Sequence, residues 1–230
     1  MRTARGVAYT AASPARKLDI REANEARILR AAEKTFAVHG FRGATTESIA
    51  NEAGLPKANV HYYFKTKANL YREVLKDILQ DWMEAAAAFE ADEDPERALT
   101  MYITAKMHFS RQRPYGSRVW ASEIMRGAPV MERFLGTTLK AWVNARVRTI
   151  RSWISAGKIR AVDPESLLYM IWAVTQHYAD FERQIAILNG GSEFDERQYR
   201  EKTEQVVRLI LGSVGVKAQE GVRARARKSA

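Results

Sequence analysis

The segment from residue 45 to residue 67 constrains the fold of this chain most, because its pattern indicates two short helices joined by a tight turn. Thr45 or Thr46 can cap the first helix. Gly54 supplies the left-handed backbone that a tight turn requires, and Pro56 suits the first turn of the second helix. The pattern therefore predicts a helix-turn-helix.

The second of these helices is expected from about residue 57 to residue 64, and it is too short and too polar on one face to serve only as core. Its side chains suit the base edges and phosphates of DNA. The alternative is a small helical bundle with no role on DNA, since the same geometry also occurs as plain packing. The residues expected on the exposed face are Lys57, Ala58, Asn59, His61 and Tyr63.

Helical periodicity dominates the rest of the chain, and no alternating strand pattern persists, so an all-α fold is predicted. Asp94 is expected to cap a helix that begins at Pro95. The expected domains are a basic flexible arm (1–21), a three-helix DNA-binding domain (22–69), a larger helical bundle for ligand binding and dimerisation (70–216), and a basic flexible tail (217–230). Other expected helices run from about Glu22 to His39, Lys67 to Phe89, Val130 to Ala156, Asp163 to Leu188 and Asp195 to Val214.

The formal net charge of +10 is concentrated at the two ends of the chain. Residues 1–17 carry +4 and residues 217–230 also carry +4, which leaves only +2 for the 199 residues between them. A basic arm beside a DNA-reading module can follow the phosphate backbone or enter a minor groove. For the C-terminal tail, a solvated segment that aids solubility is the favoured interpretation.

Composition argues against several classes of function. The chain has no cysteine, which excludes disulfides, thiolate metal sites and cysteine nucleophiles, and is compatible with a reducing cytosol. No apolar run is long enough to suggest a membrane span or a secretory signal, so a cytoplasmic protein is expected. The four histidines are widely separated and no glycine-rich phosphate loop follows a strand. An enzyme, a metal site and a cofactor are therefore not expected.

The last two long helices carry more apolar surface than a small helical pair hides internally. An isologous four-helix interface between two copies would bury it, and two-fold pairing would also compensate for the few contacts of one short reading helix. The alternative is that these side chains pack on other helices of the same chain. They are Leu167, Leu168, Ile171, Val174, Val206, Val207, Leu209, Ile210 and Val214.

A second constellation, Trp172 and Gln176, indicates a sensor site. The two residues lie one helical turn apart and share a face. The indole can stack on a flat heterocycle, while the amide offers both a donor and an acceptor to an imide-like edge. Trp82 is a candidate for the opposite wall. The alternative is that the tryptophans are ordinary core residues and that Gln176 is a polar group of a dimer interface.

Residues from about Ala26 to Leu75 resemble the DNA-binding domain of TetR-type bacterial repressors. The resemblance implies that Thr46 and Lys67, each at a helix start, contact phosphates. It also implies that Lys57, Asn59 and His61 face bases, with Tyr63 on the backbone or an adjacent base; a structural histidine is the alternative for His61. Tyr62 and Phe64 are expected to pack against Phe36 and Ile49. The residues that carry the resemblance are Ile28 to Ala32, Phe36, Gly40, Phe41, Thr46, Ile49, Ala50, Ala53, Gly54, Tyr62, Tyr63, Phe64, Lys67 and Leu70.

From Trp82 to Phe181 the chain resembles RutR-type repressors, which control pyrimidine use and respond to uracil or thymine. The resemblance implies that Trp82, Trp172 and Gln176 line the pyrimidine pocket. It implies a homodimer that releases a palindromic operator when the small planar effector binds. Alternatives are a TetR-type regulator of another catabolic or efflux pathway, with a different aromatic or heterocyclic effector, and an architectural DNA-binding protein. The motifs that carry the resemblance are Gly127 to Pro129, Gly157 to Ile159, Asp163-Pro164, Met170 to Ala173 and Thr175 to Phe181.

Overall fold

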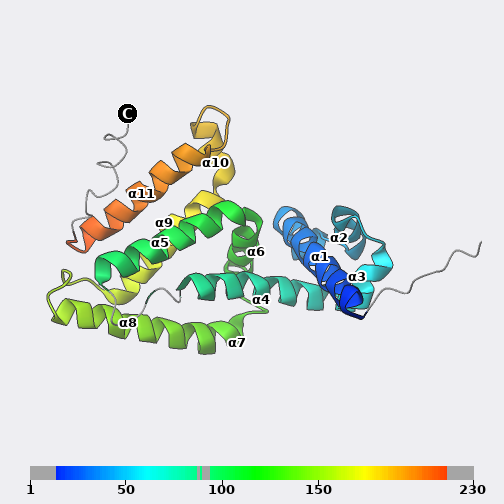
Figure 1. Cartoon of the computed structure of the whole chain (residues 1–230), viewed down its shortest axis with the longest axis horizontal. Helices are drawn as coiled ribbons and strands as arrows, with labels where there is room; N and C mark the ends of the chain where they lie inside the picture. Colours follow the sequence, from blue (N-terminus) through cyan, green and yellow to red (C-terminus); the bar gives the residue numbers. More distant parts are fainter. Residues whose placement is uncertain (1–13, 87–88, 90–93, 217–230) are drawn as a thin grey trace, which may run out of the picture. The chain divides into compact units, whose positions relative to one another are not determined.

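The computed structural model describes residues 14–86, 89 and 94–216, and within these ranges every regular element is a helix (Figure 1). The all-α prediction is confirmed. Residues 1–13 of the expected arm and the whole expected tail, 217–230, lie outside the described residues. No helix in the described ranges combines the length and apolarity that a bilayer crossing requires.

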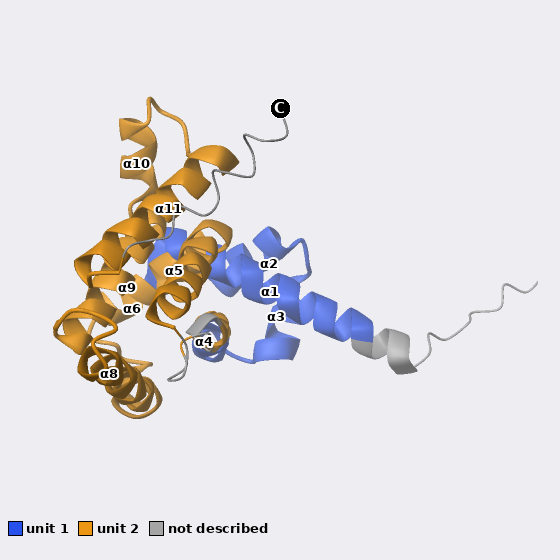
Figure 2. Cartoon of the chain, turned by 60° about the vertical axis from the view of Figure 1, so that its left-hand side comes forward, with its two compact units in different colours: residues 1–74 blue, residues 75–230 orange. Residues whose placement is uncertain are grey.

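The chain forms two compact units, residues 1–74 and 75–230 (Figure 2). Unit 1 holds three helices and the beginning of a fourth: α1 (Pro14–Gly43), α2 (Thr46–Ala53), α3 (Lys57–Phe64) and α4 (Lys67–Ala86). Unit 2 holds the remainder of α4 and the elements α5 (Pro95–Gln112), α6 (Pro114–Met125), α7 (Glu132–Phe134), the π-helical η1 (Leu135–Leu139), α8 (Lys140–Ser155), α9 (Pro164–Asp180), α10 (Glu182–Leu188) and α11 (Glu196–Ser213).

Helix α1 begins earlier than the sequence pattern predicted. It starts at Pro14 instead of Glu22, so residues 14–21 of the expected flexible arm are helical. The predicted end at Gly40 corresponds to a kink, because Gly40 has a φ of 66° while the helical turn continues to Gly43. A positive φ of this kind is accessible to glycine at little cost.

The turn between α2 and α3 is built by local capping. Thr45, and not Thr46, is the N-cap of α2: the Ser48 amide donates to the Thr45 hydroxyl at 2.9 Å, and the Thr45 amide donates to the Ser48 hydroxyl at 3.0 Å. This reciprocal capping box satisfies two donors at once. Gly54 ends α2 in the left-handed conformation with a φ of 61°. The predicted helix-turn-helix is therefore present.

Aromatic side chains fill the core of unit 1. The Phe36 ring centroid lies 6.1 Å from that of Phe41 and 5.0 Å from that of Tyr71. Phe64 is buried, as expected. Tyr62 is 71% exposed, so its expected place in the core was wrong. The physical reason is that Val60 and Phe64, one turn apart, define the buried face of α3, and Tyr62 stands on the opposite face.

Helix α5 forms the centre of unit 2 and packs against α6, α9 and α11 (Figure 1). As predicted, Asp94 caps α5: the Arg97 amide donates to its carboxylate at 3.1 Å. The fully buried apolar residues of the unit come from α4, α5, α6, α8, α9 and α11, with Leu75 and Ile78 as the large ones on α4. The other large ones are Leu99, Ile103, Met107, Ile150, Trp153 and Leu168, with the non-helical Phe89.

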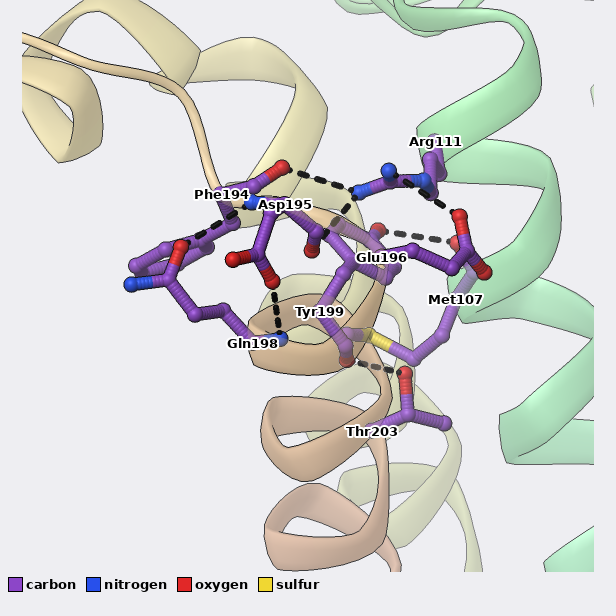
Figure 3. A network of polar contacts seen from close by, with 8 residues as sticks. All are labelled: Met107, Arg111, Phe194, Asp195, Glu196, Gln198, Tyr199 and Thr203. Carbon is purple, nitrogen blue, oxygen red and sulfur yellow. Dashed lines mark hydrogen bonds and ion pairs between the residues drawn. The ribbon is translucent and has the colours of Figure 1, made fainter.

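The start of α11 is fastened to α5 by a polar network (Figure 3). Arg111 donates to the Phe194 carbonyl at 3.2 Å and pairs with Glu196 at 3.1 Å. The Tyr199 hydroxyl donates to the Met107 carbonyl at 2.9 Å, and its ring lies under the Arg111 guanidinium. Asp195 is the N-cap of α11, which begins near its predicted start. The network therefore fixes the register of α11 on α5.

Several expected helix limits differ from the observed ones. Described α4 ends at Ala86, before the expected Phe89, and residues 87, 88 and 90–93 lie outside the described part. The single helix expected from residue 163 to residue 188 is divided at Phe181 into α9 and α10. The helix expected from residue 130 to residue 156 consists of α7, η1 and α8.

The apolar surface assigned to a dimer interface is mostly core of the same chain. Leu167, Leu168 and Ile171 on α9 are buried inside unit 2, together with their expected partners on α11, because both helices use these stripes to pack on α5. Their interpretation as interface residues was wrong, and the alternative of packing within the chain holds. Leu209 is exposed, at 72%, and Val174 is partly buried against the same core. The α11 partners are Val206, Val207, Ile210 and Val214.

We expect Leu168→Ala to lower the free energy of unfolding by about 2 to 5 kcal/mol, because it leaves a cavity in a close-packed core. Leu209→Ala, at an exposed position of α11, is the matched control and should change stability by less than about 0.5 kcal/mol. Urea unfolding followed by circular dichroism measures both. Equal losses for the two variants would contradict this assignment of core and surface.

Candidate DNA-binding and effector sites

Helix α3 presents the side chains predicted to read DNA. Lys57, Ala58 and His61 are exposed, and Asn59 and Tyr63 are partly exposed. The helix is held from beneath by its buried residues Val60 and Phe64 and packs against α2. The predicted reading face is thus a surface held on a rigid support.

Contacts from α3 to α2, and one to the residue that follows α3, organise this face. The Thr46 hydroxyl lies 3.5 Å from His61 Nε2, and His61 Nδ1 lies 3.5 Å from the Lys65 carbonyl. Lys57 lies 3.6 Å from Glu47 in an exposed ion pair. Such exposed pairs contribute little energy, so the Lys57 ammonium is easily redirected to a nucleic-acid acceptor.

Lys67, the other predicted phosphate contact, has a structural role within unit 1. Its ammonium donates to the Phe41 and Ala44 carbonyls, each at 2.8 Å, and lies 4.7 Å from the centroid of the Phe41 ring. These bonds satisfy carbonyls at the end of α1, where a helix lacks internal donors. Lys67 therefore joins the end of α1 to the start of α4, whatever it contacts on DNA.

Tyr62 was missed as a candidate for the DNA-facing surface. It is exposed beside Tyr63, and the two rings meet edge to face with centroids 5.1 Å apart. The four-residue spacing of Val60 and Phe64 is the sequence signal that could have placed Tyr62 on the outside. A hydrophobic ring with a hydroxyl suits a sugar-phosphate backbone.

In unit 2 the predicted effector residues fall in two aromatic clusters. Trp82 meets Phe109 and Trp120 edge to face, with centroids 5.6 Å and 5.2 Å away. Trp172 lies 6.2 Å from Trp142 and donates its indole N–H to the Tyr102 hydroxyl at 2.7 Å. Among the ring contacts of the described residues, none joins Trp82 directly to Trp172.

Helix α5 connects the two clusters. Tyr102 touches the Trp172 cluster, and Phe109 touches Trp82, while Lys106 stands between them with its ammonium 4.0 Å from the centroid of the Trp82 ring. Sequence reasoning missed Lys106 and Tyr102. The available signal was a lysine flanked by Ile103 and Met107 on the buried stripe of α5.

Gln176 lies one turn after Trp172 on α9 and is half-buried. The structure gives its amide no hydrogen bond to any described residue. A half-buried amide of this kind can offer its carbonyl and its NH₂ group to a ligand.

The polar groups near Lys106 have shifted proton affinities. Burial lowers the pKa of Lys106 to about 7, and the Asp180 carboxylate opposes this shift. Burial also raises the pKa of Asp180, opposed first by a 2.7 Å hydrogen bond from Ser117 and then by Arg118, Lys106 and His177. Charged groups in this part of unit 2 are therefore poorly solvated.

Arg113 fastens the corner between α5 and α6 to the helix that carries Trp82. Its guanidinium donates to Asp77 at 2.8 Å and also to Asp81, and these carboxylates lie one turn apart on α4. Charge-assisted contacts to two carboxylates are strong and directional. The position of α4 within unit 2 is thus tied to the α5–α6 corner.

Residues 28–74 match the family described as bacterial regulatory proteins, tetR family, and residues 75–217 match the YcdC-like protein, C-terminal region. The HTH-type transcriptional regulator RutR of Escherichia coli K12 is 39% identical over 84% of this chain and 91% of its own length. A tetR-family structure from Rhodococcus RHA1 has a TM-score of 0.67 at 22% identity, covering 84% and 97% of the two chains. The ketosteroid transcriptional regulator KstR2 of Mycobacterium tuberculosis has a TM-score of 0.68 at 18% identity, covering 83% and 94%.

The two family matches together span both units, and the similarity to RutR extends over most of the chain. The solved structures, at low identity, share its fold. The chain therefore belongs to the TetR family of bacterial transcriptional regulators, is similar to RutR-type members, and is a helix-turn-helix DNA-binding regulator and not an enzyme.

Proposed function

We propose that this protein is a cytoplasmic homodimeric repressor that binds a palindromic operator and is released by a small planar effector of the pyrimidine class. The observation that carries the proposal is the combination of an exposed reading helix in unit 1 with half-buried tryptophans and an unpaired amide in unit 2. The 39% identity to RutR supports uracil and thymine as the first candidates.

On the operator, each class of side chain has a distinct task. Asn59 has the amide geometry that pairs with adenine, and Lys57 has the donor that guanine accepts in the major groove. Thr46 and Tyr63 flank them with hydroxyls suited to phosphates. Lys67 contributes positive charge beside the start of α4, where helix N–H groups also favour an anion.

Asn59→Ala should cost about 1 to 3 kcal/mol of operator binding and relax base preference at one position in each half-site, because it removes a base contact. Fluorescence anisotropy with the operator and a random duplex, over a range of salt, measures this effect. Asn144→Ala, at an exposed position of α8, is the matched control. Equal losses on both duplexes would contradict the base-reading role of Asn59.

The proposed dimer uses apolar surface that the described chain leaves exposed. Tyr169, Ala173 and His177 follow one another at four-residue spacing along α9, Phe181 follows at its C-cap, and all four are exposed, with His177 as the one polar member. Leu209 adds an exposed apolar residue on α11. An isologous pairing through these helices would cover both surfaces and bring two short reading helices to adjacent half-sites.

Ala173→Glu should dissociate the dimer and weaken operator binding, because it places a carboxylate in the centre of the proposed apolar interface. Exposed alanine tolerates glutamate well in a helix, so the monomer should stay folded. Ala141→Glu on the exposed side of α8 is the matched control. Sedimentation velocity measures the mass of each variant. If Ala173→Glu is a dimer like the wild type, the interface lies elsewhere.

The effector proposal assigns stacking to the tryptophans and edge recognition to Gln176. Trp82 lies on α4, a helix that begins in unit 1 and continues into unit 2. Movement of Trp82 on ligand binding would therefore act on the helix that Lys67 begins. The ligand weakens operator binding only to the extent that it prefers the conformation that binds DNA poorly.

Gln176→Ala should abolish the effector response while leaving operator binding without effector unchanged, because it removes a ligand partner and no DNA contact. Calorimetry with uracil and thymine, followed by operator release in anisotropy, measures both properties. Gln184→Ala, at an exposed position of α10, is the matched control. If Gln176→Ala binds uracil and thymine as tightly as the wild type, this residue is not part of the effector site. If the wild type prefers another heterocycle, regulation of a different pathway is favoured.

A further inference from the structure

Lys106 is a buried cation that the described protein leaves without a hydrogen-bond partner. Its residue is 4% exposed, and its ammonium faces the Trp82 ring at 4.0 Å from the centroid. The ammonium forms no hydrogen bond or ion pair with any described residue. An ammonium has three donors, and one aromatic face does not replace the hydration that burial removes.

Neighbouring cations of unit 2, unlike Lys106, form ion pairs with carboxylates. Arg113 binds Asp77 and Asp81, Arg118 binds Glu182, and Arg111 binds Glu196. The carboxylate that raises the pKa of Lys106 by its charge is Asp180 on α9. Asp180 accepts a hydrogen bond from Ser117 and forms no ion pair with Lys106. Lys106 thus differs from these three arginines in having no carboxylate partner among the described residues.

The indole that Lys106 covers carries a buried donor without a partner among the described residues. Trp82 Nε1 is buried and has no hydrogen-bond partner, and its ring is the one that Lys106 covers. Gln176 on α9 adds a half-buried amide without a partner among the described residues. Unpaired buried polar groups cost stability, and the Lys106 ammonium against the Trp82 ring, with the Gln176 amide on the neighbouring α9, offers donors whose hydrogen bonds a ligand can complete.

We propose that Lys106 is the anion-recognising residue of the effector site and donates its ammonium N–H to an oxygen of a heterocycle that binds as an imide anion. This inference rests on the proposed effector site. It specifies in addition that the bound ligand is an anion. A neutral imide gives its proton to the neutral amine form of Lys106, whereas a ligand already ionised in water binds the ammonium form. In both cases the negative charge on the carbonyl oxygens makes them strong acceptors for the ammonium. The pyrimidine ring then stacks beside Trp82, and Gln176 donates to the same polar edge.

The first test measures how much the buried Lys106 side chain destabilises the folded protein in the absence of ligand. Lys106→Met keeps the length of the side chain and removes the charge, so it should raise the melting temperature of the free protein at pH 6. Lys158→Met, at an exposed position after α8, is the matched control and should leave it unchanged. A marked fall in the melting temperature of Lys106→Met would show a structural role and overturn the proposal.

The pH dependence of this difference has a defined sign. The folded-state pKa of Lys106 is about 7, below the unfolded value of about 10.5, so the unfolded state binds more protons between them. The destabilisation that results from burying the charged Lys106 side chain is fully present below pH 7. It disappears as the pH rises toward the unfolded-state pKa of Lys106. Asp180 on α9, with Arg118 and His177 around it, faces this region. Because both proteins contain these groups, the advantage of Lys106→Met should shrink from pH 6 to pH 9.

The second test compares two ligands by calorimetry at pH 7: uracil, a neutral imide at this pH, and barbiturate, a similar ring that is an anion. Loss of a charge-assisted hydrogen bond should weaken barbiturate binding by about 30-fold or more in Lys106→Met and uracil binding by about tenfold. Barbiturate should also drive proton uptake by wild type, seen as a dependence of the binding heat on the buffer. Lys106→Met should lose this proton uptake.

The outcomes separate the two proposals. Unchanged affinities in Lys106→Met, with normal uracil binding to wild type, would overturn the role of Lys106 and leave the proposed effector site intact. Failure of wild type to bind either ligand would overturn both the pyrimidine class and the role of Lys106, while operator binding in the same preparation would still stand as proposed. Selective loss of barbiturate binding and proton uptake, in a variant more stable than wild type, supports the inference.

Discussion

Burial of α5 among α6, α9 and α11 is the packing constraint on which the C-terminal unit depends. Helices α9 and α11 both direct their apolar stripes at α5, through residues such as Leu168 and Ile210. Those stripes are therefore not available to a second subunit. The opposite sides of α9 and α11 remain exposed, and any pairing of copies through these helices must use that surface.

The same constraint sets the chemistry inside unit 2. A helix buried on several sides offers its polar residues few acceptors, and Lys106 lies at such a position between Tyr102 and Phe109. Tyr102 uses its hydroxyl to accept from Trp172, and Ser110 donates to the Thr175 carbonyl at 2.8 Å. These two contacts join α5 to α9 without involving Lys106. The packing that stabilises the unit thus buries Lys106 without giving its ammonium a hydrogen-bond partner among the described residues.

Local features were the most predictable from the sequence. The capped start of α2, the left-handed Gly54 and the Asp94 cap all depend on residues close in sequence, and each was found near its expected position. The start of α11 was also found near its expected position, with Asp195 as its cap. The break at Phe181 was not predicted, because no glycine or proline marks it. Apolar periodicity alone also does not distinguish a stripe that packs on α5 from one that packs on another subunit.

Contacts between distant segments were the least predictable. The Trp172–Tyr102 hydrogen bond joins residues 70 positions apart, and nothing in either local sequence specifies the other partner. The sequence indicated that Trp82, Trp172 and Gln176 were special residue types in a helical bundle. It did not indicate that α5 separates the two tryptophans or places an ammonium beside Trp82, since these facts follow from how the helices pack.

If an effector binds beside Trp82, as proposed, Arg113 provides a physical route from that ligand to the helix that begins in unit 1. Two carboxylates one turn apart on α4 are fixed by a single guanidinium from the α5–α6 corner, and Trp82 follows Asp81 directly on α4. A ligand beside Trp82 therefore acts on a helix whose position is restrained by directional, charge-assisted bonds. Close-packed contacts of this kind favour discrete arrangements over gradual bending. Linkage then requires that operator DNA, by favouring one arrangement of α4, weakens the effector by the same factor by which the effector weakens the operator.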